Sequence, residues 1–167
     1  MKRLILLLFG IVPALGAQSR FVPSDSARAV AHRLAGCYRL DDGPWRADSV
    51  HAGSMSTLRT PLSFELTVEL LPGRDDIQSS EHPMFMVRDS TGQRAGTPFE
   101  FWQPGDLRTG TIRISYPMPF AGVALQLAPD GKDLVGVVTA FTDAIREGEP
   151  SEVSRPVRAR RVECPAK

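Results

Sequence analysis

The chain has 167 residues, with 20 basic and 19 acidic residues and a formal net charge of +1. A balance this close to neutrality provides no general attraction for nucleic acid or anionic lipid, so we expect neither as a partner. The length suits one domain with a core of its own.

The first seventeen residues have the pattern of an export signal. Lys2 and Arg3 form a basic n-region, an apolar run covers residues 4–14, and small residues up to Ala17 suit a signal peptidase. The apolar run is too short to span a bilayer. We therefore expect a signal peptide at residues 1–17 and an exported mature chain, periplasmic or extracellular, without a transmembrane anchor.

One short helix is predicted at the start of the mature chain. Ser24 or Asp25 can cap it, and Gly36 ends it after about Ala35. Its apolar residues recur at helical spacing and form one face: Ala27, Val30, Ala31 and Leu34.

Segments that alternate with period two dominate the rest of the chain, where glycine and proline separate them. The clearest segment is residues 62–70. Its apolar side chains are expected to be buried, namely Leu62, Phe64, Leu66, Val68 and Leu70. Glu65 and Glu69 are expected on the exposed face.

Eight such segments are predicted as strands. Their ranges are 37–40, 62–70, 84–88, 99–103, 111–116, 123–127, 134–141 and 155–163. Asp130-Gly131 gives the strongest hairpin signal, and residues 46–51 are a candidate ninth strand. The pattern predicts a mainly β fold, an antiparallel up-and-down barrel of about eight strands within a single domain at residues 18–167.

The two cysteines support closure of that barrel. Cys37 lies at the start of the first predicted strand and Cys164 follows the last, and an exported chain meets an oxidising environment. We expect one disulfide between them, which requires the first and last strands to be antiparallel neighbours and the number of strands to be even. Closing so long a loop stabilises the fold by roughly 5 kcal/mol in the chain-entropy description.

A second interpretation of Cys37 is lipidation, because residues 34–37 spell a bacterial lipobox. A lipobox must adjoin the apolar h-region of the signal. Here Asp25, Arg28 and Arg33 lie between the two, so we prefer the disulfide.

The short helix, Gly36-Cys37-Tyr38 at the first strand and the basic last strand resemble a lipocalin or a wider calycin-type barrel. That family opens with Gly-x-Trp and packs an arginine over the tryptophan. The resemblance implies that Tyr38 replaces the tryptophan and that Arg158, Arg160 or Arg161 supplies the cation. Residues 141–143 weakly match the family's Thr-Asp-Tyr motif, without the tyrosine. The alternative is an unrelated small barrel or sandwich.

No motif indicates catalysis or a cofactor. His32, His51 and His82 lack the spacing of a zinc site, and Ser54 lacks the surroundings of a hydrolase nucleophile. The aspartate pairs at 41–42 and 75–76 suit turns better than a calcium loop. We therefore expect a noncatalytic protein without a cofactor or metal.

The predicted function follows from the shape of the barrel. Side chains expected to face inward would line a mostly apolar pocket for one small hydrophobic molecule, and these are Phe64, Leu66, Ile114, Tyr116 and Leu125. A fully packed interior is the alternative arrangement. In that case the protein would be an interaction or structural module of the cell envelope, whose protein partner the sequence does not identify.

Overall fold

The structure is a computed structural model that describes residues 21–41, 62–89, 100–118, 121–142 and 152–165. Within these ranges the chain forms one helix and eight strands. The elements are α1 Asp25–Leu34, β1 Gly36–Leu40, β2 Ser63–Leu70, β3 Phe85–Asp89, β4 Phe101–Asp106, β5 Thr111–Met118, β6 Ala121–Asp130, β7 Asp133–Thr142 and β8 Glu152–Val162.

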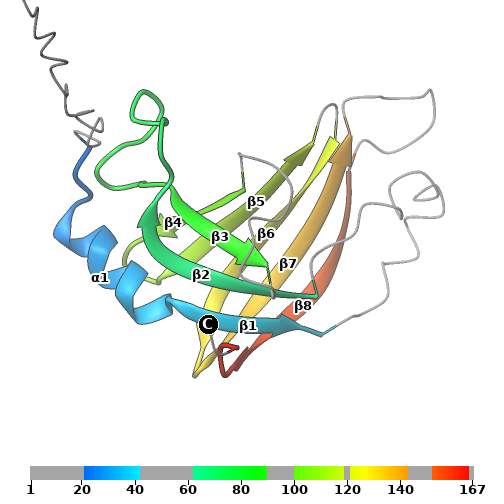
Figure 1. Ribbon diagram of the computed structural model, residues 1–167. Coiled ribbons are helices and arrows are strands. Elements are labelled where there is room, and N and C mark those ends of the chain that lie inside the picture. The colour runs from blue at the N-terminus through cyan, green and yellow to red at the C-terminus, as the bar shows by residue number, and fades with distance from the viewer. Residues whose placement is uncertain (1–20, 42–61, 90–99, 119–120, 143–151, 166–167) are drawn as a thin grey trace, which may run out of the picture.

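The strands form a closed antiparallel barrel in chain order, in which β1 also pairs with β8 (Figure 1). This confirms the predicted architecture, and each strand begins and ends within a few residues of its predicted range. The predicted hairpin joins β6 to β7, where Asp130 pairs with Asp133 and Gly131 adopts a positive φ of 62°. The candidate ninth strand at residues 46–51 lies outside the described residues.

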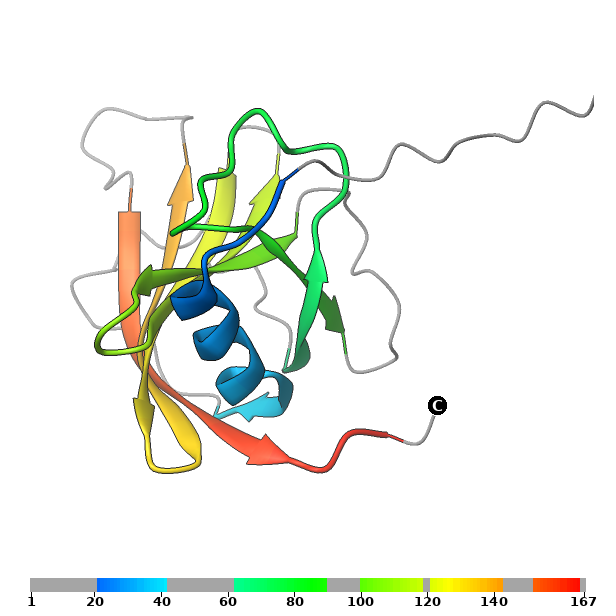
Figure 2. The same ribbon diagram turned by 90° about the vertical axis from the view of Figure 1, so that its left-hand side faces the viewer.

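Helix α1 covers one end of the barrel (Figure 2). Ser24 caps it by accepting a hydrogen bond from the backbone N–H of Ala27 at 3.1 Å. The four predicted apolar residues of the helix are buried, and Leu34 and Val30 belong to the same core cluster as the barrel interior.

The disulfide joins Cys37 to Cys164 with their Cα atoms 5.2 Å apart, as predicted. Cys37 lies opposite Val162 in the ladder between β1 and β8. The bond therefore extends a ladder in which only four residue pairs join the first strand to the last. No helix in the described ranges has the length and apolar character needed to cross a membrane.

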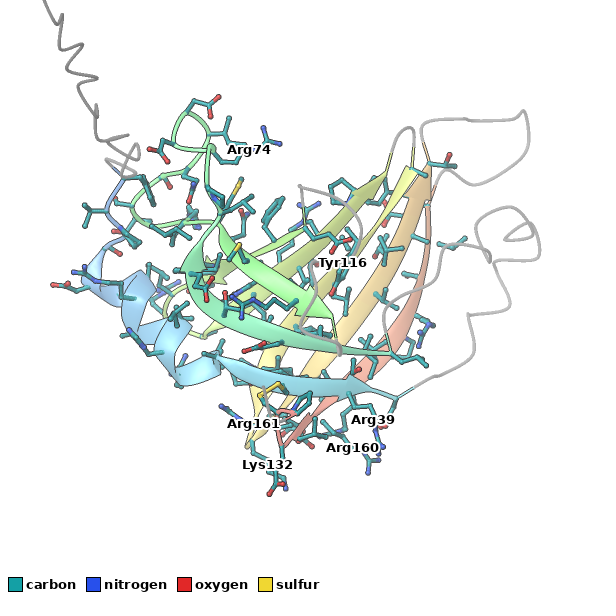
Figure 3. The ribbon with its side chains drawn as sticks, in the orientation of Figure 1. Arg39, Arg74, Tyr116, Lys132, Arg160 and Arg161 are labelled. Atoms are coloured by element: carbon teal, nitrogen blue, oxygen red, sulfur yellow. A yellow bond between two sulfur atoms is a disulfide. The ribbon has the colours of Figure 1, made fainter. Side chains whose placement is uncertain are left out.

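Arg161, labelled in Figure 3, is the arginine that packs over Tyr38. Its guanidinium carbon lies 5.6 Å from the centre of the Tyr38 ring. The same guanidinium donates to the carbonyl oxygens of Arg33 and Ala35, at the C-terminal end of α1. Gly36 leaves room for it, because a Cβ there would lie 2.8 Å from the Arg161 guanidinium, and its φ of 145° also favours glycine. Arg161 thus ties the helix to the last strand.

Two titratable groups take part in this closure. Burial raises the pKa of the Tyr38 phenol, although the Arg161 guanidinium opposes the rise, and the phenol donates to the Leu34 carbonyl at 2.8 Å. The Asp133 carboxylate accepts a hydrogen bond from the backbone N–H of Arg161 at 3.1 Å, and this bond lowers the pKa of Asp133. The β6–β7 turn is thereby attached to the end of β8.

The facing of β2 changes partway along the strand, which corrects part of the prediction. Phe64 and Leu66 are buried as expected, but Val68 is 41% exposed and Leu62, just before the strand, is 66% exposed. Leu70 is partly buried, Glu65 is half-buried and Glu69 is exposed.

The cause is a shift of register against β3 between Leu66 and Leu70, which turns Thr67 inward. The Thr67 carbonyl accepts a hydrogen bond from the buried indole N–H of Trp102 at 2.9 Å. The Thr67 hydroxyl donates to the Met86 carbonyl at 3.0 Å. The irregularity therefore supplies the polar partner that a tryptophan inside the barrel needs.

We predict that Phe64→Ala lowers the free energy of unfolding by roughly 3–5 kcal/mol, because it removes a ring stacked on Tyr38 inside the core. The matched change Val68→Ala, on the same strand beyond the irregularity, should stay within about 0.5 kcal/mol. Denaturant titrations of both variants measure the difference. Equal losses would contradict the facing described for β2.

We also predict that Arg161→Ala lowers the free energy of unfolding by about 1–2 kcal/mol, since the carbonyls at the end of α1 and the Tyr38 ring lose their cation. The control is Arg160→Ala, which removes only an exposed ion pair with Asp41 and should cost at most about 0.5 kcal/mol. Thermal and denaturant unfolding of the two variants provide the comparison. Arg161 has no closing role if its variant is as stable as the control.

Candidate functional site

The five residues predicted to bind a ligand all face the barrel interior and are buried. Phe64, Leu66, Ile114, Tyr116 and Leu125 belong to one continuous hydrophobic cluster. Binding by these residues stays a prediction, and they do not form one compact group. Leu66 lies opposite Gly36, next to the end of α1, whereas Tyr116 lies near the opposite end of the barrel.

The interior near α1 is filled by large side chains. Tyr38 stacks on Phe64 with ring centres 5.7 Å apart, and Phe85 packs against Trp102 at 4.9 Å. All four rings are at most 2% exposed. A ligand site is therefore better sought in the other half of the barrel.

Smaller side chains face inward on β6, β7 and β8 in that other half. One inward row consists of Tyr116, Val123, Ala140 and Val153, which are direct neighbours across the ladders from β5 to β8. Tyr116 is the only large residue of this row, and its phenol gives the row a polar group. We call this row, together with Arg155, the inner site.

Arg155 is the unexpected member of the inner site. It is 3% exposed and lies opposite Val138, which in turn lies opposite Leu125. Arg155 was not among the residues predicted to face inward. Residues 155, 157 and 159 share one face of β8, so strict alternation places Arg155 inside with Val157 and Ala159.

Two glycines of β6 and β7 have structural roles rather than making room for a ligand. A Cβ at Gly136 would lie 1.9 Å from the Gln126 carbonyl oxygen, so β6 and β7 approach too closely for any side chain there. At Gly122, which pairs with Phe141, the same space is occupied by the Phe141 ring.

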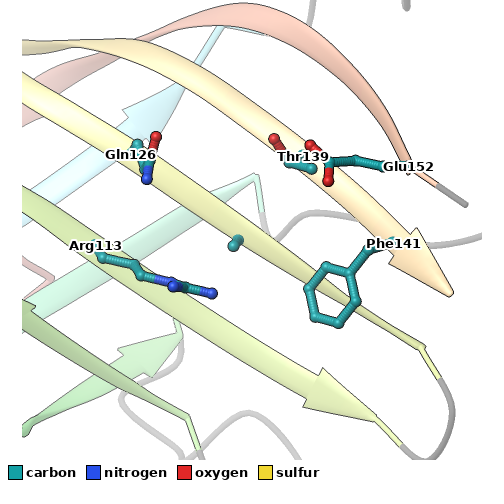
Figure 4. A pocket seen from close by; sticks show the side chains of 6 residues that line it. Arg113, Gln126, Thr139, Phe141 and Glu152 are labelled. Atoms are coloured by element: carbon teal, nitrogen blue, oxygen red, sulfur yellow. The ribbon is translucent and has the colours of Figure 1, made fainter. Parts of the chain in front are cut away.

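A groove lies on the outside of the barrel (Figure 4). This outer groove has a volume of about 370 Å³ and crosses β5 to β8. Its lining residues are Arg113, Ala124, Gln126, Thr139, Phe141 and Glu152. None of the five predicted ligand residues lines it, because Ile114, Tyr116 and Leu125 lie on the opposite face of β5 and β6. The other two predicted residues lie on β2, outside the groove.

The described residues contain no group of three potential ligands suited to a metal ion. The Nδ1 atom of His82 lies 3.0 Å from the Pro104 carbonyl oxygen. His32 is exposed on α1. His51, Ser54 and the second residue of the aspartate pair at 41–42 lie outside the described residues.

Comparisons with known proteins found no match. No protein-family model matches the chain, and neither a curated protein nor a solved structure is significantly similar to it. The closed eight-stranded barrel with its Arg161–Tyr38 contact is compatible with a lipocalin-like fold.

Proposed function

We propose that this protein is an exported, noncatalytic carrier that binds one small, mostly apolar molecule inside the barrel, in the half away from α1. The ligand has an apolar body and an acidic head group. Arg155 is the observation that carries the proposal, because it is only 3% exposed and places a guanidinium in a row of apolar side chains that face the barrel interior.

The surroundings of Arg155 support this ligand class. Val138, Val153 and Leu125 are buried apolar neighbours within the same inward rows, and Tyr116 adds a phenol. Ligand sites are commonly apolar with a few polar groups that fix orientation. A guanidinium binds a carboxylate through two parallel hydrogen bonds, which would place the head group at β8.

The alternative is an envelope interaction module without a ligand, as a fully packed interior would suggest. Such a module needs a contiguous apolar surface patch. In the described part of the chain, the exposed large apolar side chains are spread over separate elements: Val22, Leu62, Val68, Ile77, Val137 and Val162. This distribution favours the carrier.

We predict that the wild type binds N-phenylnaphthylamine at one saturable site. Palmitic acid should displace this probe with an affinity about tenfold higher than that of methyl palmitate. Arg155→Met should remove this preference for the acid while retaining binding of the ester. Fluorescence titration measures both affinities, and near-UV circular dichroism checks that the variant is folded.

The matched control is Arg160→Met, which makes the same change on the outer face of the same strand and should retain the preference. If the wild type gives no saturable binding across fatty acids, retinoids and isoprenoid quinones, the carrier proposal fails and the interaction module replaces it. If Arg155→Met prefers palmitic acid over methyl palmitate as strongly as the wild type does, Arg155 does not bind the head group.

A further inference from the structure

The outer groove arises from the sizes of the residues in three parallel rows on the outside of β5 to β8. The middle row consists of Ser115, Ala124, Thr139 and Ser154, which are direct neighbours across the ladders. These side chains are short, so they form a floor. The floor runs across the strands because each row follows the hydrogen-bonding direction of the sheet.

Larger side chains form a ridge on each side of the floor. Arg113 and Gln126 are a direct cross-strand pair on one ridge, and Phe141 and Glu152 are a direct pair on the other. The two ridges are four residues apart along each strand, which is about 13 Å at a rise of about 3.3 Å per residue. The groove spans four strands, or about 14 Å at a spacing of about 4.8 Å.

The polar side chains of the groove are not used by the fold. In the described part of the chain, Arg113, Gln126, Thr139 and Glu152 make no side-chain hydrogen bond or ion pair. Other arginines on the outer face behave differently, because Arg88 and Arg158 each reach a carboxylate at 2.7 Å or less. Arg113 and Glu152 therefore offer opposite charges in one groove without neutralising each other.

The side chains turn into the groove. Figure 4 shows the Arg113 guanidinium directed along the sheet toward Phe141, and the Glu152 carboxylate turned toward Thr139. The Phe141 ring is held across β6, since its tip fills the space above Gly122. The groove thus combines a fixed apolar ring with a donor, an acceptor, an amide and a hydroxyl.

These groups discriminate between ligand classes. A charged ligand gains from one of Arg113 and Glu152 and is repelled by the other, so a neutral ligand is favoured. An extended peptide would find no free backbone partner on the face of a sheet, where the ladders already use the main-chain groups. A ligand with many hydroxyls donates and accepts at once, and the apolar face of its ring can pack on Phe141.

We propose that the outer groove binds a short neutral oligosaccharide, with hydroxyls bonded to Arg113, Gln126 and Glu152 and a sugar ring packed on Phe141. The volume of about 370 Å³ falls within the range of small-ligand sites. This site lies on the opposite face of the sheet from the inner site, and it does not depend on the carrier function.

The test is a titration of the isotope-labelled mature chain with maltotriose, cellotriose and chitotriose, followed by amide shifts in NMR spectra. We expect at least one trisaccharide to give a saturable shift confined to β5–β8. Arg113→Gln and Glu152→Gln should each weaken that binding about tenfold. Both residues are exposed, so these variants should fold.

The matched control is Arg39→Gln, an exposed arginine outside the groove on β1, which should bind like the wild type. Absence of a saturable shift with all three trisaccharides would overturn the proposal. The proposal would also be overturned if Arg113→Gln and Glu152→Gln bound the trisaccharide with the same affinity as the control. Saturation of the groove by the tripeptide Ala-Ala-Ala, without saccharide binding, would show that the ligand class is wrong.

Discussion

The pairing of β1 with β8 is the constraint on which the other features depend. It makes the sheet continuous, so every strand has one face toward the core and one toward solvent and no strand is left as an open edge. β1 contributes only five residues, and the closing ladder is correspondingly short. The Cys37–Cys164 bond and Arg161 strengthen it from two sides, one covalently and one by joining β8 to the end of α1.

Closure also separates the two proposed sites. Adjacent residues on β6 and β7 serve different surfaces, because Leu125 faces the core while Ala124 and Gln126 line the outer groove. The inner site is apolar with one buried cation, whereas the outer groove is polar with one aromatic ring. The same four strands thus carry two chemically distinct surfaces.

The sequence was sufficient for features that depend on local pattern or on the two chain ends. The burial of Phe64 and the disulfide are of this kind, as is the helix cap, for which the sequence offered Ser24 or Asp25. The inward turn of Thr67 was not predictable, since it depends on the indole of Trp102, which is distant in sequence. Arg155 was missed because its charge outweighed the alternation that places it inside. The outer groove depends on the register of four strands, which no single segment encodes.

The closing ladder has a consequence for how the chain folds. The disulfide partners are 127 positions apart, and the β1–β8 contacts bridge a similar distance, so they are the most non-local in the barrel. The entropy of closing so long a loop must be lost before these contacts contribute, which slows folding. A chain oxidised at Cys37 and Cys164 beforehand is already a ring and begins with that entropy removed. We therefore expect the folding rate to depend on whether this disulfide forms before or after the strands assemble.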